Sequence, residues 1–177
     1  MRTLILGSAA ACAVIGAAQA QELRVTMNAI TAEGVGEPLG TVLITQTPAG
    51  AEFVTELRGL PPGEHGFHLH EKADCGPAPN AEGTMAAGMA AGSHWDPQAT
   101  KAHHGPEGQG HLGDLPLLVV QADGSAKGAA MAPRITDLSQ LAGKSLMIHA
   151  GGDNYSDQPK PLGGGGARIA CGVIGQP

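Results

Sequence analysis

Three of the chain's eight histidines stand close together, in the stretch HGFHLH at 65–70. His68 and His70 are two residues apart, so in a β-strand their side chains leave the same face and can reach one ion. His65 has odd spacing from both, and its side chain points elsewhere if the strand continues back to it. Because neutral imidazole is the commonest metal ligand in proteins, this stretch predicts a metal site.

The remaining histidines extend this set, and a carboxylate joins them. His94, His103, His104 and His111 fall inside or just after a long segment without a strand pattern, Asp114 follows His111, and His149 ends a candidate strand. One tetrahedral ion cannot use so many donors, so two metal sites are the simplest count. Imidazole suits copper, zinc, iron and nickel, and a closed set of His and Asp without cysteine favours zinc. Any single histidine is readily explained as an ordinary surface or core residue, but that explanation does not account for all eight lying between 65 and 149.

The sequence predicts a scaffold of short strands for these side chains. Leu23, Val25, Met27 and Ala29 alternate with polar residues, the period of two expected of a half-buried strand. Further candidate strands contain Val42 and Ile44, then Phe53 and Leu57, followed by 64–71, 115–122, 126–131, 145–150 and 167–174. Only 136–141 suggests a helix, of one or two turns. Short strands separated by Gly and Pro turns are typical of an antiparallel sandwich or barrel.

Two long segments interrupt this pattern. Residues 76–110 hold Gly, Ala, Pro and polar residues with no credible strand, and 151–166 ends in four consecutive glycines. Loops of this length in a compact domain are usually functional or disordered. Composition alone favours disorder, but the histidines in the first segment favour function. Met85 and Met89 offer a transient copper site there, although loop filler is the favoured interpretation.

The first twenty residues differ from the rest of the chain. Arg2 precedes an apolar run from 4 to 18 and a small-x-small sequence at 18–20, the pattern of a cleavable secretory signal. We therefore expect a signal peptide at 1–20, one domain at 21–177, and no stable membrane insertion after cleavage. A lipid anchor on Cys12 is less favoured, because the apolar stretch before it is short. Without Arg2 the formal net charge of −6 becomes −7, which excludes nucleic acid as a partner.

Removal of the signal leaves two cysteines, Cys75 and Cys171. In an oxidising compartment such a pair joins, and the disulfide would close the loop from 75 to 171. The chain-entropy model gives a loop of this length roughly 4 to 5 kcal/mol of stabilisation as an upper figure. The alternative is two separate buried thiols.

Four motifs in order carry a resemblance to a known family. They are HGFHLHEKADC, HWDPQATKAHHGPEGQGHLGDLP, HAGGD and GGGGARIACGVI, and they resemble the copper/zinc superoxide dismutases, specifically the exported bacterial branch. The resemblance covers 65–174 and is only generic before it. It implies an all-β, antiparallel Greek-key sandwich or flattened barrel with two long metal-binding loops, located in the periplasm.

The resemblance also implies roles for individual residues. The copper ligands would be His68, His70, His94 and His149, and the zinc ligands His94, His103, His111 and Asp114. His94 would serve both ions, Asp153 would link His68 to His103, and His65 would brace the site. Arg168 would stand beside the copper and pair with the incoming anion. His104 adjoins His103 and could compete for zinc, but the family pattern favours His103.

The implied activity is the dismutation of superoxide, with one copper and one zinc ion per subunit. Superoxide would first reduce and then reoxidise the copper, while His94 releases the copper and takes up a proton. Arg168 and Lys160 would supply a positive funnel in an acidic chain, with Lys72 and Lys101 simply solvated. Monomer and homodimer both stay open, and Trp95 and Tyr155 are candidate exposed aromatics for a subunit interface.

Two rival functions use the same donors. A zinc hydrolase needs an open zinc position and a general base, yet every carboxylate near the cluster is already assigned. A metal-storage protein would keep the ligands but would not need Arg168 or a shared His94.

Overall fold

The computed structural model describes residues 22–175, and the predicted signal peptide, its cleavage site and Cys12 lie outside this range. The described chain is all-β, with short 3-10 turns as its only helical elements. The strands are β1 (Glu22–Thr31), β2 (Gly34–Thr47), β3 (Gly50–Leu57), β4 (Gly63–His65), β5 (Phe67–His70), β6 (Ala78–Pro79), β7 (Met85–Ala86), β8 (Leu118–Val120), β9 (Ala126–Ala132), β10 (Ser145–His149) and β11 (Arg168–Val173). The turns are η1 (Met89–Ala91), η2 (Leu138–Leu141) and η3 (Leu162–Gly164).

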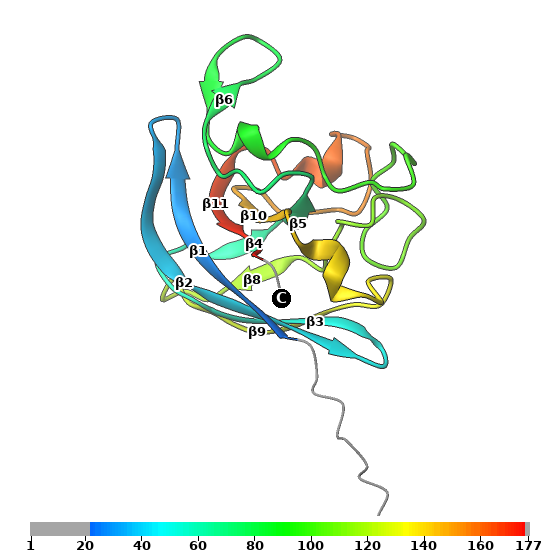
Figure 1. Ribbon diagram of the computed structural model, residues 1–177. Coiled ribbons are helices and arrows are strands. Elements are labelled where there is room, and N and C mark those ends of the chain that lie inside the picture. The colour runs from blue at the N-terminus through cyan, green and yellow to red at the C-terminus, as the bar shows by residue number, and fades with distance from the viewer. Residues whose placement is uncertain (1–21, 176–177) are drawn as a thin grey trace, which may run out of the picture.

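Most strands form one antiparallel sheet that curls on itself (Figure 1). Its strand order is β5-β10-β11-β1-β2-β3-β9, and β4 pairs with β8 in a separate small sheet. Neighbours such as β5 and β10, or β1 and β11, are distant in sequence, so the connections cross over as in a Greek key. The predicted fold class is therefore confirmed.

The first strand shows how sequence alternation becomes a buried face. Leu23, Val25 and Met27 are buried, as predicted. Beyond Met27 the β1–β2 register shifts, Ala29 is only partly buried, and Ile30 is buried on the other face of the sheet, in a small cluster with Met147 and Cys171. Ile30 is covered there by the loop that follows Cys75, since a Cβ at Gly88 would lie 2.7 Å from Ile30 Cδ1.

The prediction of a single strand over 64–71 is wrong, because the chain divides at Gly66. β4 pairs with β8, whereas β5 pairs with β10. Gly66 donates its N–H to the Gly151 carbonyl oxygen at 2.8 Å, and its own carbonyl accepts the His149 N–H at 2.9 Å. A Cβ at Gly66 would lie 2.9 Å from His68 Cε1, so the close approach beside that ring needs glycine. All four residues of β5 are buried.

The expectation that 76–110 holds no strand is also wrong. β6 and β7 form a hairpin with two residues on each side, which projects from the sheet in Figure 1. Asn80 closes its turn, since its side-chain oxygen accepts the N–H groups of Glu82 and Thr84. Strands this short leave no periodic pattern to find. The predicted helix at 136–141 is the single 3-10 turn η2.

The expectation that Trp95 is an exposed aromatic is also wrong, since it is only 8% exposed and belongs to the core. The Lys144 ammonium lies 5.7 Å from the centre of its ring and covers it. Tyr155 is partly buried, and its hydroxyl oxygen accepts the Leu117 N–H at 3.0 Å. Trp95 therefore packs inside one chain and is not an exposed aromatic for an interface.

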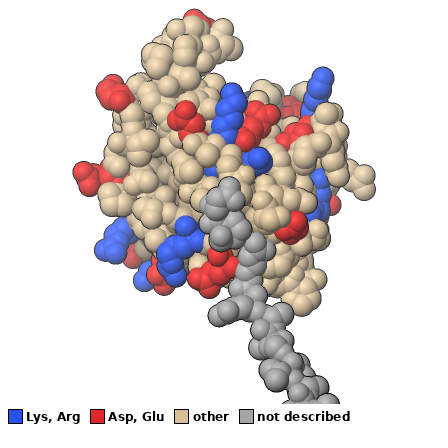
Figure 2. All heavy atoms as spheres, viewed as in Figure 1, with Lys and Arg blue, Asp and Glu red and all other residues tan. Residues whose placement is uncertain are grey.

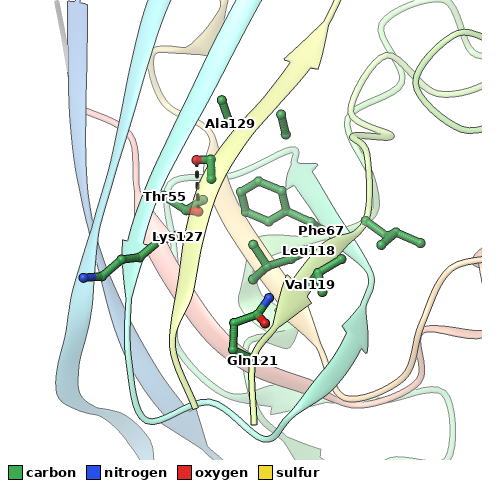
Figure 3. A pocket seen from close by; sticks show the side chains of 10 residues that line it. Thr55, Phe67, Leu118, Val119, Gln121, Lys127 and Ala129 are labelled. Carbon is green, nitrogen blue, oxygen red and sulfur yellow. Dashed lines mark hydrogen bonds between the residues drawn. The ribbon is translucent and has the colours of Figure 1, made fainter. Parts of the chain in front are cut away.

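The strands β8 and β9 follow each other but do not pair within residues 22–175. A cavity of about 230 Å³ lies between them, lined by side chains such as Phe67, Leu118 and Val119 (Figure 3). No histidine lines this cavity, so it is separate from the predicted metal centre.

Charged side chains of both signs are interspersed on the face shown in Figure 2. None of the helical elements between residues 22 and 175 has the length and apolar character to cross a membrane.

Candidate metal centre

Two neighbouring strands and the first long loop bring four histidines together. His68 and His70 come from β5, and His149 ends the adjacent strand β10. His94 reaches them from the loop, where an isolated β-bridge pairs its backbone with that of His70. All four residues are buried, and one ring nitrogen of each lies within 4.8 Å of the others. The same-face spacing seen in the sequence therefore produces the expected convergence.

Hydrogen bonds decide which nitrogen of two of these rings carries the proton. His70 Nδ1 donates to the Gly92 carbonyl oxygen at 3.0 Å, and His149 Nδ1 donates to that of Gly166 at 3.1 Å, because a carbonyl can only accept. In the neutral rings both Nε2 atoms then carry lone pairs, yet they face each other at 3.4 Å. Two lone pairs in that position repel unless a cation lies between them.

The other two rings of this group each have a buried nitrogen without a hydrogen-bond partner. His68 Nε2 lies 2.7 Å from Asp153 Oδ2 and donates to it, which leaves His68 Nδ1 buried without a partner. His94 Nε2 is likewise buried and unpartnered. Buried polar atoms are normally satisfied, so unpaired nitrogens that converge on one point fit a metal ion.

A second group surrounds the carboxylate of Asp114. Its Oδ1 lies 3.0 Å from His94 Nδ1, 3.0 Å from His103 Nδ1 and 3.2 Å from His111 Nδ1. His103 Nδ1 has no hydrogen-bond partner, since its approach to Asp114 lacks hydrogen-bond geometry. Three imidazoles and one carboxylate, all buried, form the closed four-ligand set that suits zinc. His94 belongs to both groups, through a different nitrogen in each.

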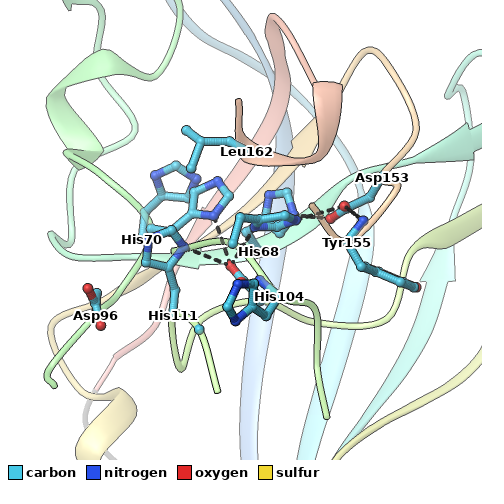
Figure 4. A network of polar contacts seen from close by, with 12 residues as sticks. His68, His70, Asp96, His104, His111, Asp153, Tyr155 and Leu162 are labelled. Carbon is cyan, nitrogen blue, oxygen red and sulfur yellow. Dashed lines mark hydrogen bonds and ion pairs between the residues drawn. The ribbon is translucent and has the colours of Figure 1, made fainter. Parts of the chain in front are cut away.

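Asp153 connects the two groups from outside (Figure 4). Its Oδ2 accepts the His68 Nε2–H and its Oδ1 accepts the His103 Nε2–H, each at 2.7 Å. The Tyr155 N–H also donates to Oδ1, at 2.7 Å. Each bond fixes one ring so that its other nitrogen faces a metal group, which is how outer partners orient ligands.

His65 lies outside both groups and joins two backbone segments. Its Nδ1 is 2.7 Å from the His149 carbonyl oxygen, and its Nε2 is 2.8 Å from that of Pro61. The ring thus connects the end of β10 to the segment that contains Pro61. His104 is exposed and belongs to neither group of potential ligands.

Burial and neighbours set the charge states of the metal-free site. Burial lowers the pKa of His70 and His149 well below the usual value and lowers the pKa of His94 to about 3. Burial also acts against protonation of His103, but its contacts with Asp114 and then Asp153 outweigh this and raise its pKa to about 9. The first group therefore consists of neutral rings, the form that binds transition metals.

Arg168 is held beside the first group by backbone carbonyls. Its Nη1 donates to the Gly88 oxygen at 2.6 Å and its Nη2 to the Gly92 oxygen at 2.8 Å. The Gly92 oxygen also accepts from His70, so the guanidinium and one ring of the group share an acceptor. The guanidinium is partly buried, and burial lowers the pKa of Arg168.

The disulfide predicted from the cysteine count is present. Cys75 and Cys171 are bonded, with 5.7 Å between their Cα atoms. Cys171 lies in β11 together with Arg168, and Cys75 begins the loop that supplies Gly88 and Gly92. The crosslink therefore joins the strand that carries the guanidinium to the segment that holds it.

A surface hollow of about 430 Å³ reaches the rings of His94 and His111. Lys101, expected to be merely solvated, lines this hollow, and so does Leu162. Neither Arg168 nor Lys160 lines it. The carboxylates of Glu71 and Asp96 also line the hollow and offset the lysine charge, so this opening is not uniformly positive.

Comparisons with known proteins agree with this geometry. The copper/zinc superoxide dismutase family matches residues 39–174. The chain belongs to this family. It is 56% identical over 164 residues to the superoxide dismutase [Cu-Zn] of Escherichia coli K12, covering 93% of this chain and 94% of the relative.

Solved structures show the same fold. The Cu/Zn superoxide dismutase of Brucella abortus is 47% identical with a TM-score of 0.85, covering 87% of this chain and 99% of the other. A monomeric copper, zinc superoxide dismutase of Salmonella enterica is 56% identical with a TM-score of 0.77, again covering 87% and 99%. As a copper/zinc superoxide dismutase the chain is an oxidoreductase that uses copper and zinc, and its two groups of ligands match the two sites.

Some contacts of this superoxide dismutase site had no signal in the sequence. The carbonyls of Gly88 and Gly92 hold Arg168, but every residue has a carbonyl and nothing in the sequence singles these out. Asp157 accepts the His103 N–H at 2.9 Å, and no motif distinguished it from other loop carboxylates.

Proposed function

We propose that this chain is exported to the bacterial periplasm and dismutates superoxide there, which protects the cell envelope. Two superoxide ions and two protons would yield one dioxygen and one hydrogen peroxide. The observation that carries the proposal is the position of His94, whose Nδ1 faces Asp114 while its Nε2 faces the first group without a partner. One ring that serves two groups suits a pair of coupled metal ions.

The ligand sets follow from the two groups. His68, His70, His94 and His149 would hold copper, and His94, His103, His111 and Asp114 would hold zinc. When bound, copper supplies one-electron chemistry by alternating between its two oxidation states, while zinc has no redox chemistry and only fixes the ligands. Asp153 and His65 would keep the rings in their orientations.

His94 is the proposed carrier of one proton. Its Nδ1 and the Asp114 carboxylate belong to the same proposed zinc set, so with zinc bound the ring would be held in place while Nε2 gains or loses a proton. Burial disfavours a charged His94 in the absence of metal, since it lowers the pKa to about 3. With the metals bound, a proton carried by Nε2 would be passed on to a peroxide product, since no other protein group shares that nitrogen.

Arg168 is the proposed binding group for the anion. Two of the five N–H donors of its guanidinium go to the Gly88 and Gly92 carbonyls, which leaves others for a small oxyanion. In a chain with net negative charge, superoxide would be attracted only by local positive charge, for which Arg168 and exposed Lys160 are the candidates.

Export rests on the signal pattern of the first twenty residues and on the disulfide, which forms in oxidising compartments. Cleavage would leave a mature chain from Gln21. All proposed ligands come from one chain, so activity would not require a homodimer. Cell fractionation and the mass of the mature protein test the first point, and sedimentation tests the second.

Activity and metal content together test the function. We expect the purified protein to hold about one copper and one zinc per chain and to consume superoxide. Arg168→Ala should keep the copper but lose about tenfold in rate, the lower end of what electrostatic attraction contributes. Fully metallated wild type without turnover would contradict the proposal and favour metal storage. Hydrolysis that depends on zinc alone would favour a hydrolase.

A further inference from the structure

One carboxylate outside both ligand groups joins the two long loops. Asp157 Oδ2 accepts the His103 N–H at 2.9 Å, and Asp157 Oδ1 accepts the Leu162 N–H at 3.1 Å. His103 belongs to the first loop and is a proposed zinc ligand, whereas Leu162 begins η3 in the second loop. A single side chain therefore fixes the backbone of a ligand relative to the segment that lies over it.

That segment has a strained conformation that needs support. Leu162 has φ +54°, in the left-handed region that a side chain with a Cβ rarely adopts. Its side chain is 39% exposed and lines the hollow that reaches His94 and His111. Figure 4 shows Leu162 above the rings. The hydrogen bond to Asp157 holds the Leu162 backbone in this position over the centre.

The next residue, Gly163, packs directly against the side chains of Asp153 and His103. Gly163 is buried with φ +70°, and a Cβ there would collide with Asp153 Oδ1 and lie 2.9 Å from His103 Nε2. The backbone at 163 thus packs directly on the Asp153–His103 hydrogen bond. A shift of 162–163 by a few tenths of an ångström would either open this contact or compress it.

We propose that Asp157 is a positioning residue that locks His103 and the 162–163 segment onto Asp153, and that this lock slows the release of zinc. The proposal rests on the proposed zinc site. It concerns retention of the ion and not the redox step, so it can be tested without superoxide.

The test compares zinc-loaded, copper-free protein with variants in the same form. Asp157→Ala removes both hydrogen bonds, and Asp157→Asn keeps one acceptor oxygen. Asp123→Asn is the control, since Asp123 also accepts two hydrogen bonds, from Ser125 N at 2.9 Å and Ser125 Oγ at 2.6 Å, in the turn before β9. All three remove one negative charge.

Transfer of zinc to a chromophoric chelator is measured over time. We expect release about tenfold faster from Asp157→Ala, a smaller increase from Asp157→Asn, and the wild-type rate from Asp123→Asn. The visible absorption of cobalt(II) placed in the zinc site gives a second measurement. Its bands should shift in Asp157→Ala and not in the control, because they report ligand geometry.

Wild-type release rates and cobalt spectra in both Asp157 variants would overturn the proposal. If the variants do not fold, hydrogen exchange of the wild type decides, since rapid exchange of the His103 and Leu162 amides would overturn it and strong protection would support it. A wild type that binds no zinc would refute the proposed function instead. Exchange of the same amides in the metal-free protein would then decide the role of Asp157.

Discussion

Replacement of Asp153 by asparagine removes the group that orients one ring in each set of ligands. Its side chain is fully buried, and its carboxylate accepts the Nε2–H of His68 and of His103, each at 2.7 Å. Asparagine has nearly the same shape, so packing should change little. Only one of its two terminal atoms can accept, however, and the amide NH₂ would face an imidazole N–H.

The Asp153→Asn substitution should weaken metal binding at one of the two sites. The ring that faces the amide either loses its hydrogen bond or moves its proton to Nδ1, the nitrogen that points into the ligand group. Loss of one hydrogen bond to a charged group costs about 1.5–3 kcal/mol. Changes in such outer partners typically weaken metal binding about 10- to 100-fold, which agrees with that free energy. We therefore expect one site in Asp153→Asn to weaken by this factor, and the other to stay close to wild type.

Competition with chelators of known affinity, done separately for copper and zinc, measures both constants. Asp137→Asn is the matched control, because Asp137 Oδ1 accepts the Ser139 N–H at 2.9 Å in the same spacing as Asp153 and Tyr155. Both substitutions remove one negative charge. If Asp153→Asn binds both metals as tightly as the control does, the orienting role of Asp153 is refuted.

Two further predictions concern stability. Cys171→Ser opens a crosslink between residues 96 apart, so the free energy of unfolding measured with urea should fall by up to about 4–5 kcal/mol. Adding reductant to the wild type is the control and should cause an equal loss. No loss of stability in the variant would contradict the chain-entropy argument. In the metal-free protein the lowered pKa of His70 and His149 means that the unfolded chain binds protons first, so stability should fall as the pH drops below about 6.5. The raised pKa of His103 acts oppositely, and its contribution should be lost as the pH rises toward about 9. Urea midpoints of metal-free protein should therefore be highest near pH 6.5, and a midpoint that rises steadily with acid would show the reasoning to be wrong.

Part of the centre follows from spacing alone. His68 and His70 had to share a face of any strand that contains them, and the excess of imidazoles over one tetrahedral set indicated two ions. The cysteine count predicted the crosslink that the structure contains. The shared role of His94 and the link through Asp153 came only from the resemblance to a family, because neither has a local pattern.

The features that the sequence did not predict have a common physical cause. Gly66 divides a stretch with continuous strand character, Ile30 is buried under the loop that follows Cys75, and Trp95 is buried although its neighbours are polar. Each depends on what packs against the segment from a distant part of the chain. Local propensity carries no information about such contacts, and the sequence around each site looks ordinary.

The two ligand groups also differ in what positions them. Three rings of the first group come from β5 and β10, adjacent strands held by a continuous antiparallel ladder. The second group comes entirely from residues 94–114, inside and just after the first long loop, and it is closed by contacts with the second loop. Loss of loop order would therefore leave His68, His70 and His149 near one another but would scatter the proposed zinc ligands. His94, the one ring in both groups, would move with the loop, so retention of zinc also governs the geometry on the copper side.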